Sequence, residues 1–160
     1  MHVLAKPAAL ISGALLITVT AGPAEAAPRL AIDLRGADVG SFVIAEDGSA
    51  RLTGNVTGNP FDGGYTAVLA AVDGSLPDPG VCEPATATLD VSGPKDRFLQ
   101  VAATGQVCGQ WADATYVVTH SFVGHYDVTG ATTKRLRGTD GWISLILATE
   151  GQADVEAIDT

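Results

Sequence analysis

Short apolar runs rich in Val, Thr and Ala are interrupted about every ten residues by Gly, Asp, Asn or Pro along most of this chain. Such punctuation is typical of an all-β domain with many antiparallel strands. No stretch shows a convincing helical period, so helices are not expected. We predict strands over residues 29–35, 40–46, 50–57, 64–73, 85–92, 98–107, 115–128, 141–148 and 152–159.

Antiparallel strands in this number leave two main architectures, a closed up-and-down barrel or a two-sheet sandwich. We predict a single antiparallel β-barrel, because hairpins dominate and the strand at 115–128 is long. The two-sheet β-sandwich is the alternative. A straight strand of that length would span roughly 48 Å. It must therefore bend or break.

The two cysteines, Cys82 and Cys108, test the strand assignment independently. If the strands flanking the SGPKDR turn form a hairpin in which Leu89 faces Val101, the same register puts Cys82 opposite Cys108. Directly opposed antiparallel residues lie close enough for a disulfide. We therefore predict one disulfide. Two cysteines alone cannot complete a zinc site, and we expect no metal or cofactor.

Two further hairpins can be paired from their turns. A two-residue D-G turn would make Val43 face Leu52. Near the C-terminus, a three-residue T-E-G loop would make Leu145 face Val155 on the inner side. The outer side of that pair is polar except for Ile146, an apolar residue in a solvated position.

The N-terminus has the organisation of a secretory signal. A short n-region precedes an apolar run over about residues 8–19, and a small-residue A-E-A site follows at 24–26. We predict a signal peptide at 1–26, a single β domain at 27–160, and a secreted, extracellular protein with no stable membrane insertion after cleavage. An uncleaved anchor is the alternative.

The chain carries a formal net charge of −9. A protein this acidic repels phosphate backbones and anionic lipid heads, and we therefore expect no nucleic acid among its partners. We expect a small molecule or an extracellular partner. The KRLRG segment concentrates Lys134, Arg135 and Arg137, and it either binds an anionic partner or forms a solvated turn that balances Asp127 and Asp140.

The stretch TYVVTHSFVGHYDVTG holds two of the three histidines. Alternation along a strand puts Tyr116, His120, Phe122 and Tyr126 on one face and His125 on the other. We predict that the first four line a ligand pocket at the mouth of the barrel. Ordinary core and rim packing is the alternative.

Gly124 decides whether this assignment of faces holds. A glycine inside a strand often marks a bulge, and one extra residue here would turn His120 and His125 to the same side. Convergence of the histidines would favour an enzyme. Trp111 and Trp142 both follow loops, where an exposed indole stacks on a sugar or contacts a partner, and where packing is the alternative.

The segment FVGHYDVTGATTKRLRGTDGW, residues 122–142, resembles part of the allene oxide cyclase and dirigent-like barrel superfamily. There a strand ending in Y-x-V-T-G precedes a loop of the form G-T-G-R-F-x-G-A-x-G. The positions that fit, after a one-residue gap, are Tyr126, Val128, Thr129, Gly130, Arg135, Leu136, Gly138 and Gly141. Thr133 stands where the family has a glycine. The whole chain also resembles the small exported proteins common in actinobacteria. These resemblances imply a secreted barrel, and no catalytic residue of the cyclases matches a motif here.

These patterns predict a secreted β-barrel-like protein that acts by binding a small ligand or an extracellular partner. Two alternatives stay open: a cyclase- or isomerase-type enzyme using His120 or His125, and a cell-envelope structural or interaction protein using the arginine loop. We favour binding over catalysis, because the chain has no G-x-S-x-G elbow, H-E-x-x-H pair, phosphate loop or catalytic cysteine signature.

Overall fold

The computed structural model describes residues 31–112, 117–148 and 152–159. The predicted signal peptide and Tyr116 lie outside these residues. The elements are β1 (Asp33–Gly36), β2 (Gly40–Ile44), β3 (Ala50–Asn59), β4 (Gly63–Ala71), β5 (Cys82–Ser92), β6 (Phe98–Ala112), β7 (Val117–Ala131), the 3-10 turn η2 (Lys134–Leu136), β8 (Asp140–Leu147) and β9 (Gln152–Asp159). No helix in the described part of the chain is long and apolar enough to cross a membrane.

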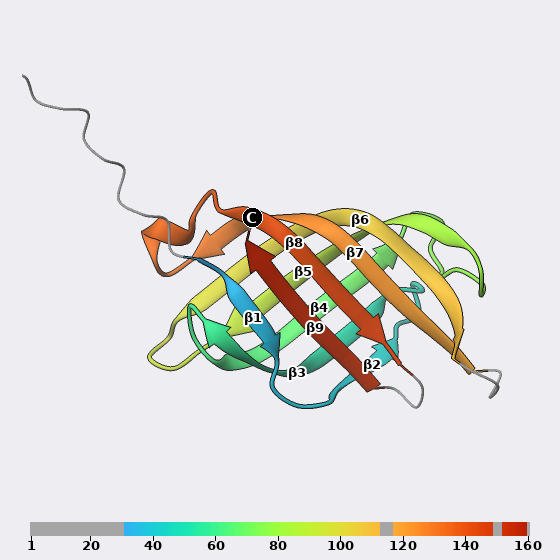
Figure 1. Ribbon diagram of the computed structural model, residues 1–160, viewed down its shortest axis with the longest axis horizontal. Coiled ribbons are helices and arrows are strands. Elements are labelled where there is room, and N and C mark those ends of the chain that lie inside the picture. The colour runs from blue at the N-terminus through green and yellow to red at the C-terminus, as the bar shows by residue number, and fades with distance from the viewer. Residues whose placement is uncertain (1–30, 113–116, 149–151, 160) are drawn as a thin grey trace, which may run out of the picture.

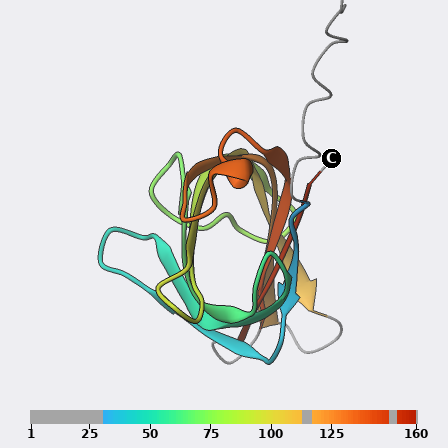
Figure 2. The same cartoon turned by 90° about the vertical axis from the view of Figure 1, so that its left-hand side faces the viewer.

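The strands form a closed eight-strand antiparallel barrel (Figure 1, Figure 2). From β3 to β9, each strand pairs with the next one along the chain. β1 and β2 share the remaining position in succession, because each pairs with β3 on one side and with β9 on the other. The barrel prediction is confirmed, and the sandwich alternative is wrong.

Residues 37–39 leave the sheet between β1 and β2. The Asp38 carboxylate accepts hydrogen bonds from the backbone N–H of Asn55 at 3.1 Å and from its side-chain amide at 2.7 Å. These bonds, the side-chain one first, lower the pKa of Asp38 below its ordinary value. They hold the outward excursion in one conformation while the barrel stays closed on both sides of it.

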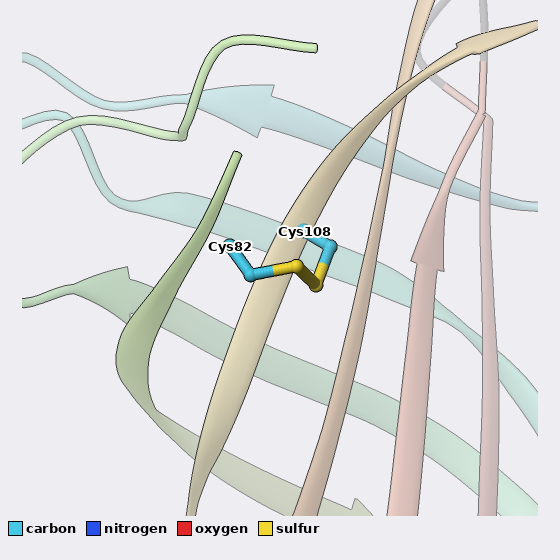
Figure 3. Close-up of a disulfide and its surroundings, with 2 residues drawn as sticks. All are labelled: Cys82 and Cys108. Carbon is cyan, nitrogen blue, oxygen red and sulfur yellow. A yellow bond between two sulfur atoms is a disulfide. The ribbon is translucent and has the colours of Figure 1, made fainter. Parts of the chain in front are cut away.

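The β5–β6 hairpin has the predicted register. Leu89 faces Val101, and Cys82 faces Cys108 across the strand pair. The two sulfurs form a disulfide, with Cα atoms 4.0 Å apart (Figure 3). One pairing therefore satisfies both the apolar inner face and the covalent link, as the sequence predicts.

The β2–β3 hairpin differs from its predicted register by one residue. Phe42 faces Leu52, where the two-residue turn predicts Val43. The loop is longer than predicted, because the backbone N–H of Ala45 donates to the carbonyl of Ser49 at 2.8 Å and Gly48 adopts a φ of 81°. A turn followed by a left-handed glycine adds one residue to a two-residue hairpin and shifts the pairing.

The β8–β9 pair has the predicted register. Leu145 faces Val155, while Ile146 points outward and is 44% exposed. The loop that joins these strands lies outside the described residues, so its predicted conformation stays a prediction. The alternating pattern alone was sufficient here, because both strands have one buried face and one solvated face.

The barrel interior is filled with side chains. Phe122 and Tyr126 on β7 are completely buried there, together with Leu, Ile, Val and Ala side chains from every strand of the ring from β3 to β9. The end of the barrel that carries η2, which we call the η2 end, faces the viewer in Figure 2. The opposite end carries residues 72–81 and lies next to Cys82 and Cys108; we call it the disulfide end.

Candidate functional site

The segment 72–81 crosses the disulfide end of the barrel between β4 and β5. It is fastened to β6 through Gly109, whose carbonyl accepts from Gly80 at 2.9 Å and whose N–H donates to Val81 at 3.0 Å. A side chain at position 109 would not fit, because its Cβ would lie 2.5 Å from the carbonyl oxygen of Pro77. The glycine therefore lets the segment lie directly against the strand.

His120 makes the second attachment of this segment. It faces Gly109 across the β6–β7 pair, and its Nε2 donates to the carbonyl oxygen of Pro77 at 3.0 Å. A carbonyl can only accept, so the hydrogen-bonding tautomer carries its proton on Nε2. The imidazole is part-buried beneath the segment.

A cavity of about 310 Å³ lies beside this contact. Its walls come from the β2–β3 hairpin, the segment 72–81 and the start of β7. The residues that define it are Ile44, Leu76, Pro77, Pro79, Val118 and His120. Ligand pockets in proteins begin at about this volume and combine apolar walls with a few polar groups.

Of the four residues predicted to line a pocket, His120 is the one that borders this cavity. Phe122 and Tyr126 point inward, as their alternation predicts, but both are completely buried in the core and do not line it. Tyr116 lies outside the described residues. Most of the remaining wall comes from Leu76 and its neighbours in the L-P-D-P-G segment, where no sequence pattern indicated a site.

His120 and His125 lie on opposite faces of β7. Pairing with β6 and with β8 runs without interruption through Gly124, so there is no bulge at that glycine. The register with β6 shifts instead at Thr129, which has no partner between Val128 and Gly130. The structure does not bring the two histidines together.

His125 points outward and belongs to a different group of side chains. Its Nε2 donates to the carboxylate of Asp140 at 3.1 Å. Its ring also meets Trp142 edge-on, with centroids 5.7 Å apart and planes at 90°. Trp142 and Trp111 are 54% and 57% exposed, so neither indole is buried in the core.

The basic segment forms a turn anchored by one apolar side chain. Leu136 is completely buried, while Lys134, Arg135 and Arg137 are exposed around it. The Arg137 guanidinium donates to the carbonyl oxygen of Ala131 at 3.4 Å. This geometry presents three positive charges to solvent without excluding either interpretation of the segment, partner binding or charge balance.

Within the described residues, no group of three or more His, Cys, Asp or Glu side chains is arranged to hold a metal ion. The expectation of no metal or cofactor stays a prediction. Comparison with protein-family models, with curated proteins and with solved structures gave no match to this chain. The resemblance to the allene oxide cyclase and dirigent-like barrels therefore stays a prediction, and the fold in common is a closed barrel.

Proposed function

We propose that this protein is a secreted binding protein that holds a small, mostly apolar ligand in the cavity at the disulfide end of its barrel. The observation that carries the proposal is the 310 Å³ cavity itself, which is walled by aliphatic and proline side chains and bordered by the imidazole of His120. The packed interior supports the same location, because the barrel core has no room for a ligand between side chains such as Phe122 and Tyr126.

The chemistry of the walls defines the ligand class. Ile44, Leu76 and Val118 offer apolar contacts, which stabilise a bound apolar group in proportion to the area removed from water. Ser75 and Asp78 add polar groups at the rim. A compact ligand with an apolar body and one or two hydrogen-bonding groups fits this combination.

Secretion is part of the proposal and rests on the N-terminal sequence pattern. The disulfide between Cys82 and Cys108 is compatible with an oxidising compartment. It also fastens the strands next to the cavity, so oxidation and cavity geometry are linked in the same region. Mass spectrometry of the exported protein, with the mature N-terminus expected near Ala27, tests this part separately.

Prodan, a neutral naphthalene dye whose emission shifts to the blue in apolar surroundings, tests the cavity. We expect saturable binding by the folded protein. Val118→Phe should fill the cavity and weaken binding at least about tenfold, equivalent to 1.4 kcal/mol. Val117→Phe is the matched control, because Val117 is exposed on the other side of the same strand end. It should leave affinity within about twofold, a change of less than 0.5 kcal/mol.

Two results would count against the cavity. One is the absence of saturable prodan binding by the wild-type protein. The other is equal affinity of the wild type and Val118→Phe, with circular dichroism showing that both are folded. In either case the binding of small apolar ligands would have to be abandoned as the function of this end of the barrel.

The basic turn supports a second candidate, recognition of an anionic partner in the cell envelope. The exposed side chains of Lys134, Arg135 and Arg137 stand on a turn whose position is fixed by buried Leu136. Arginine suits carboxylates because its guanidinium binds them in a bidentate manner. Pull-down of envelope components by the wild type but not by Arg135→Ala/Arg137→Ala would favour this function, and equal capture by both proteins would count against it.

A further inference from the structure

A second groove lies on the outer face of the barrel, on the opposite side of β7 from His120. It has a volume of about 460 Å³ and runs along the β6–β7 pair, with the Trp142 indole from β8 at one side. The side chains that define it are Thr104, Gln106, Ser121, Val123, His125 and Trp142. The groove is separate from the proposed ligand cavity, because inward and outward residues alternate along the strand.

The floor of this groove depends on two glycines. Gly105 on β6 faces Gly124 on β7, and a Cβ on Gly105 would collide with the carbonyl of Val123. The two backbones can therefore approach closely at this point. The result is a hollow in the sheet surface, bordered by the outward side chains of the neighbouring rows.

The indole beside the hollow is held in position from one side. Asp140 accepts a hydrogen bond from His125 at 3.1 Å, and the His125 ring contacts Trp142 edge-on. An aromatic side chain that is already oriented loses less conformational entropy when a ligand stacks on it. More than half of the Trp142 surface nevertheless stays exposed to solvent.

The polar groups around the indole are mixed donors and acceptors. Thr104 and Ser121 supply hydroxyls, Gln106 supplies an amide, and His125 supplies an imidazole. Three successive rows contribute, Thr104 with His125, Gln106 with Val123, and Cys108 with Ser121. Rows on one face of a strand repeat about every 6.7 Å, so the groove is longer than a single sugar ring.

The charge around the groove excludes one class of ligand. Asp127 faces Asp140 across the β7–β8 pair at its margin, and the whole chain carries a net charge of −9. Sulfated or phosphorylated ligands would be repelled. A neutral molecule with an apolar face and many hydroxyls fits both the indole and the polar rows.

We infer that this outer groove binds neutral oligosaccharides, with Trp142 as the stacking platform and His125 as the residue that orients it. The apolar face of a pyranose ring lies on the indole, and its hydroxyls exchange hydrogen bonds with Thr104, Gln106 and Ser121. This site is independent of the cavity at the disulfide end and does not require the proposed function to be correct.

An array of neutral and sulfated glycans, probed with the mature protein, tests the inference. We expect signal on neutral oligosaccharides and none on sulfated ones. The strongest neutral glycan is then titrated by calorimetry. Trp142→Ala should lower the affinity about tenfold or more, as truncation of an aromatic hot spot does. His125→Ala should lower it by a smaller factor.

Two matched controls distinguish binding in the groove from binding elsewhere on the barrel. Trp111→Ala removes an equally exposed indole from the end of β6 and should leave affinity unchanged. Val118→Phe fills the cavity at the disulfide end and should also leave glycan affinity unchanged, so failure of one proposal is distinguishable from failure of the other.

Three outcomes would overturn the inference. The first is an array without signal on any neutral glycan. The second is an affinity that Trp142→Ala leaves intact. The third is a concentration-dependent oligomer, seen by analytical ultracentrifugation, that Trp142→Ala converts to monomer. That result would assign the exposed indole to contact between copies of this chain.

Discussion

The two ends of the barrel are closed by different physical means. At the η2 end, Leu136 from the turn is completely buried, and Phe61 from the β3–β4 connection is nearly so. At the disulfide end, the segment 72–81 is held by the backbone bonds to Gly109 and by His120, and its own apolar residue Leu76 is only partly buried. Apolar burial closes one end, whereas hydrogen bonds and a nearby covalent link close the other.

This difference explains where a cavity remains. A buried leucine excludes space around itself, because protein interiors are packed as densely as organic crystals. A segment attached through its backbone leaves space between its points of attachment. The cavity beside His120 is therefore a consequence of how the disulfide end is closed. Function by ligand binding is expected at the end that is held by directional bonds.

The largest effect should come from comparing the two leucines. Leu136→Ala removes a completely buried side chain and should cost about 2–5 kcal/mol of unfolding free energy. Leu76→Ala, beside an existing cavity, should cost about half of that or less. Urea denaturation of both variants, with the m-value monitored, measures the two losses. Equal losses would mean that the two ends are closed by burial to the same degree.

Removal of the disulfide should loosen one end and not the other. Cys82→Ala/Cys108→Ala opens a loop of sequence separation 26 and should cost about 3–4 kcal/mol in the chain-entropy treatment. Amide hydrogen exchange should accelerate at Gly80 and Gly109 more than at Leu136. The comparison of the ends fails if exchange rises equally at both.

The histidines of β7 provide a smaller and more specific test. His120→Ala leaves the Pro77 carbonyl without its imidazole donor and should cost about 1 kcal/mol. His125→Ala breaks an exposed contact with Asp140 and should cost less than about 1 kcal/mol. Exchange at Gly80 should respond to the first substitution only. A matched response to both would show that the Pro77 contact does not hold the segment.

Sequence alone was sufficient for the β5–β6 and β8–β9 registers. Apolar alternation and the cysteines select one pairing for β5–β6, and burial of one face selects it for β8–β9. The β2–β3 register was wrong by one residue, because the left-handed Gly48 lengthens the loop and no second constraint such as a disulfide corrects it.

The candidate sites were less accessible to sequence reasoning. Alternation correctly put His120 inside and His125 outside, but it could not show that Phe122 and Tyr126 fill the core. The path of segment 72–81 depends on Gly109, which is distant in sequence. The outer groove depends likewise on a glycine facing a glycine across β6 and β7. Closure of the ring of strands creates both features.

The smallest effect at neutral pH is expected at Tyr65, which lies nearer the η2 end of its strand. Its hydroxyl is buried without a hydrogen-bond partner among the described residues. Because nothing is lost by removing an unpaired hydroxyl, Tyr65→Phe should change the unfolding free energy by less than about 1 kcal/mol, in the stabilising direction. Tyr126, whose buried hydroxyl also has no partner in the described part of the chain, should behave in the same way.

Alkaline pH should make the difference at Tyr65 measurable. Burial, followed by the charges of Asp154 and Asp38, raises the pKa of Tyr65 from 10.0 to about 12. A raised pKa in the folded state contributes stability that is complete below pH 10 and is lost as the pH rises towards 12, because the unfolded chain ionises first. Urea midpoints of wild type and Tyr65→Phe should therefore diverge above about pH 10, with the wild type falling faster. Parallel curves through this range would mean that the hydroxyl at the η2 end is as solvated as in the unfolded chain, and that this end is less tightly closed than the burial of Leu136 indicates.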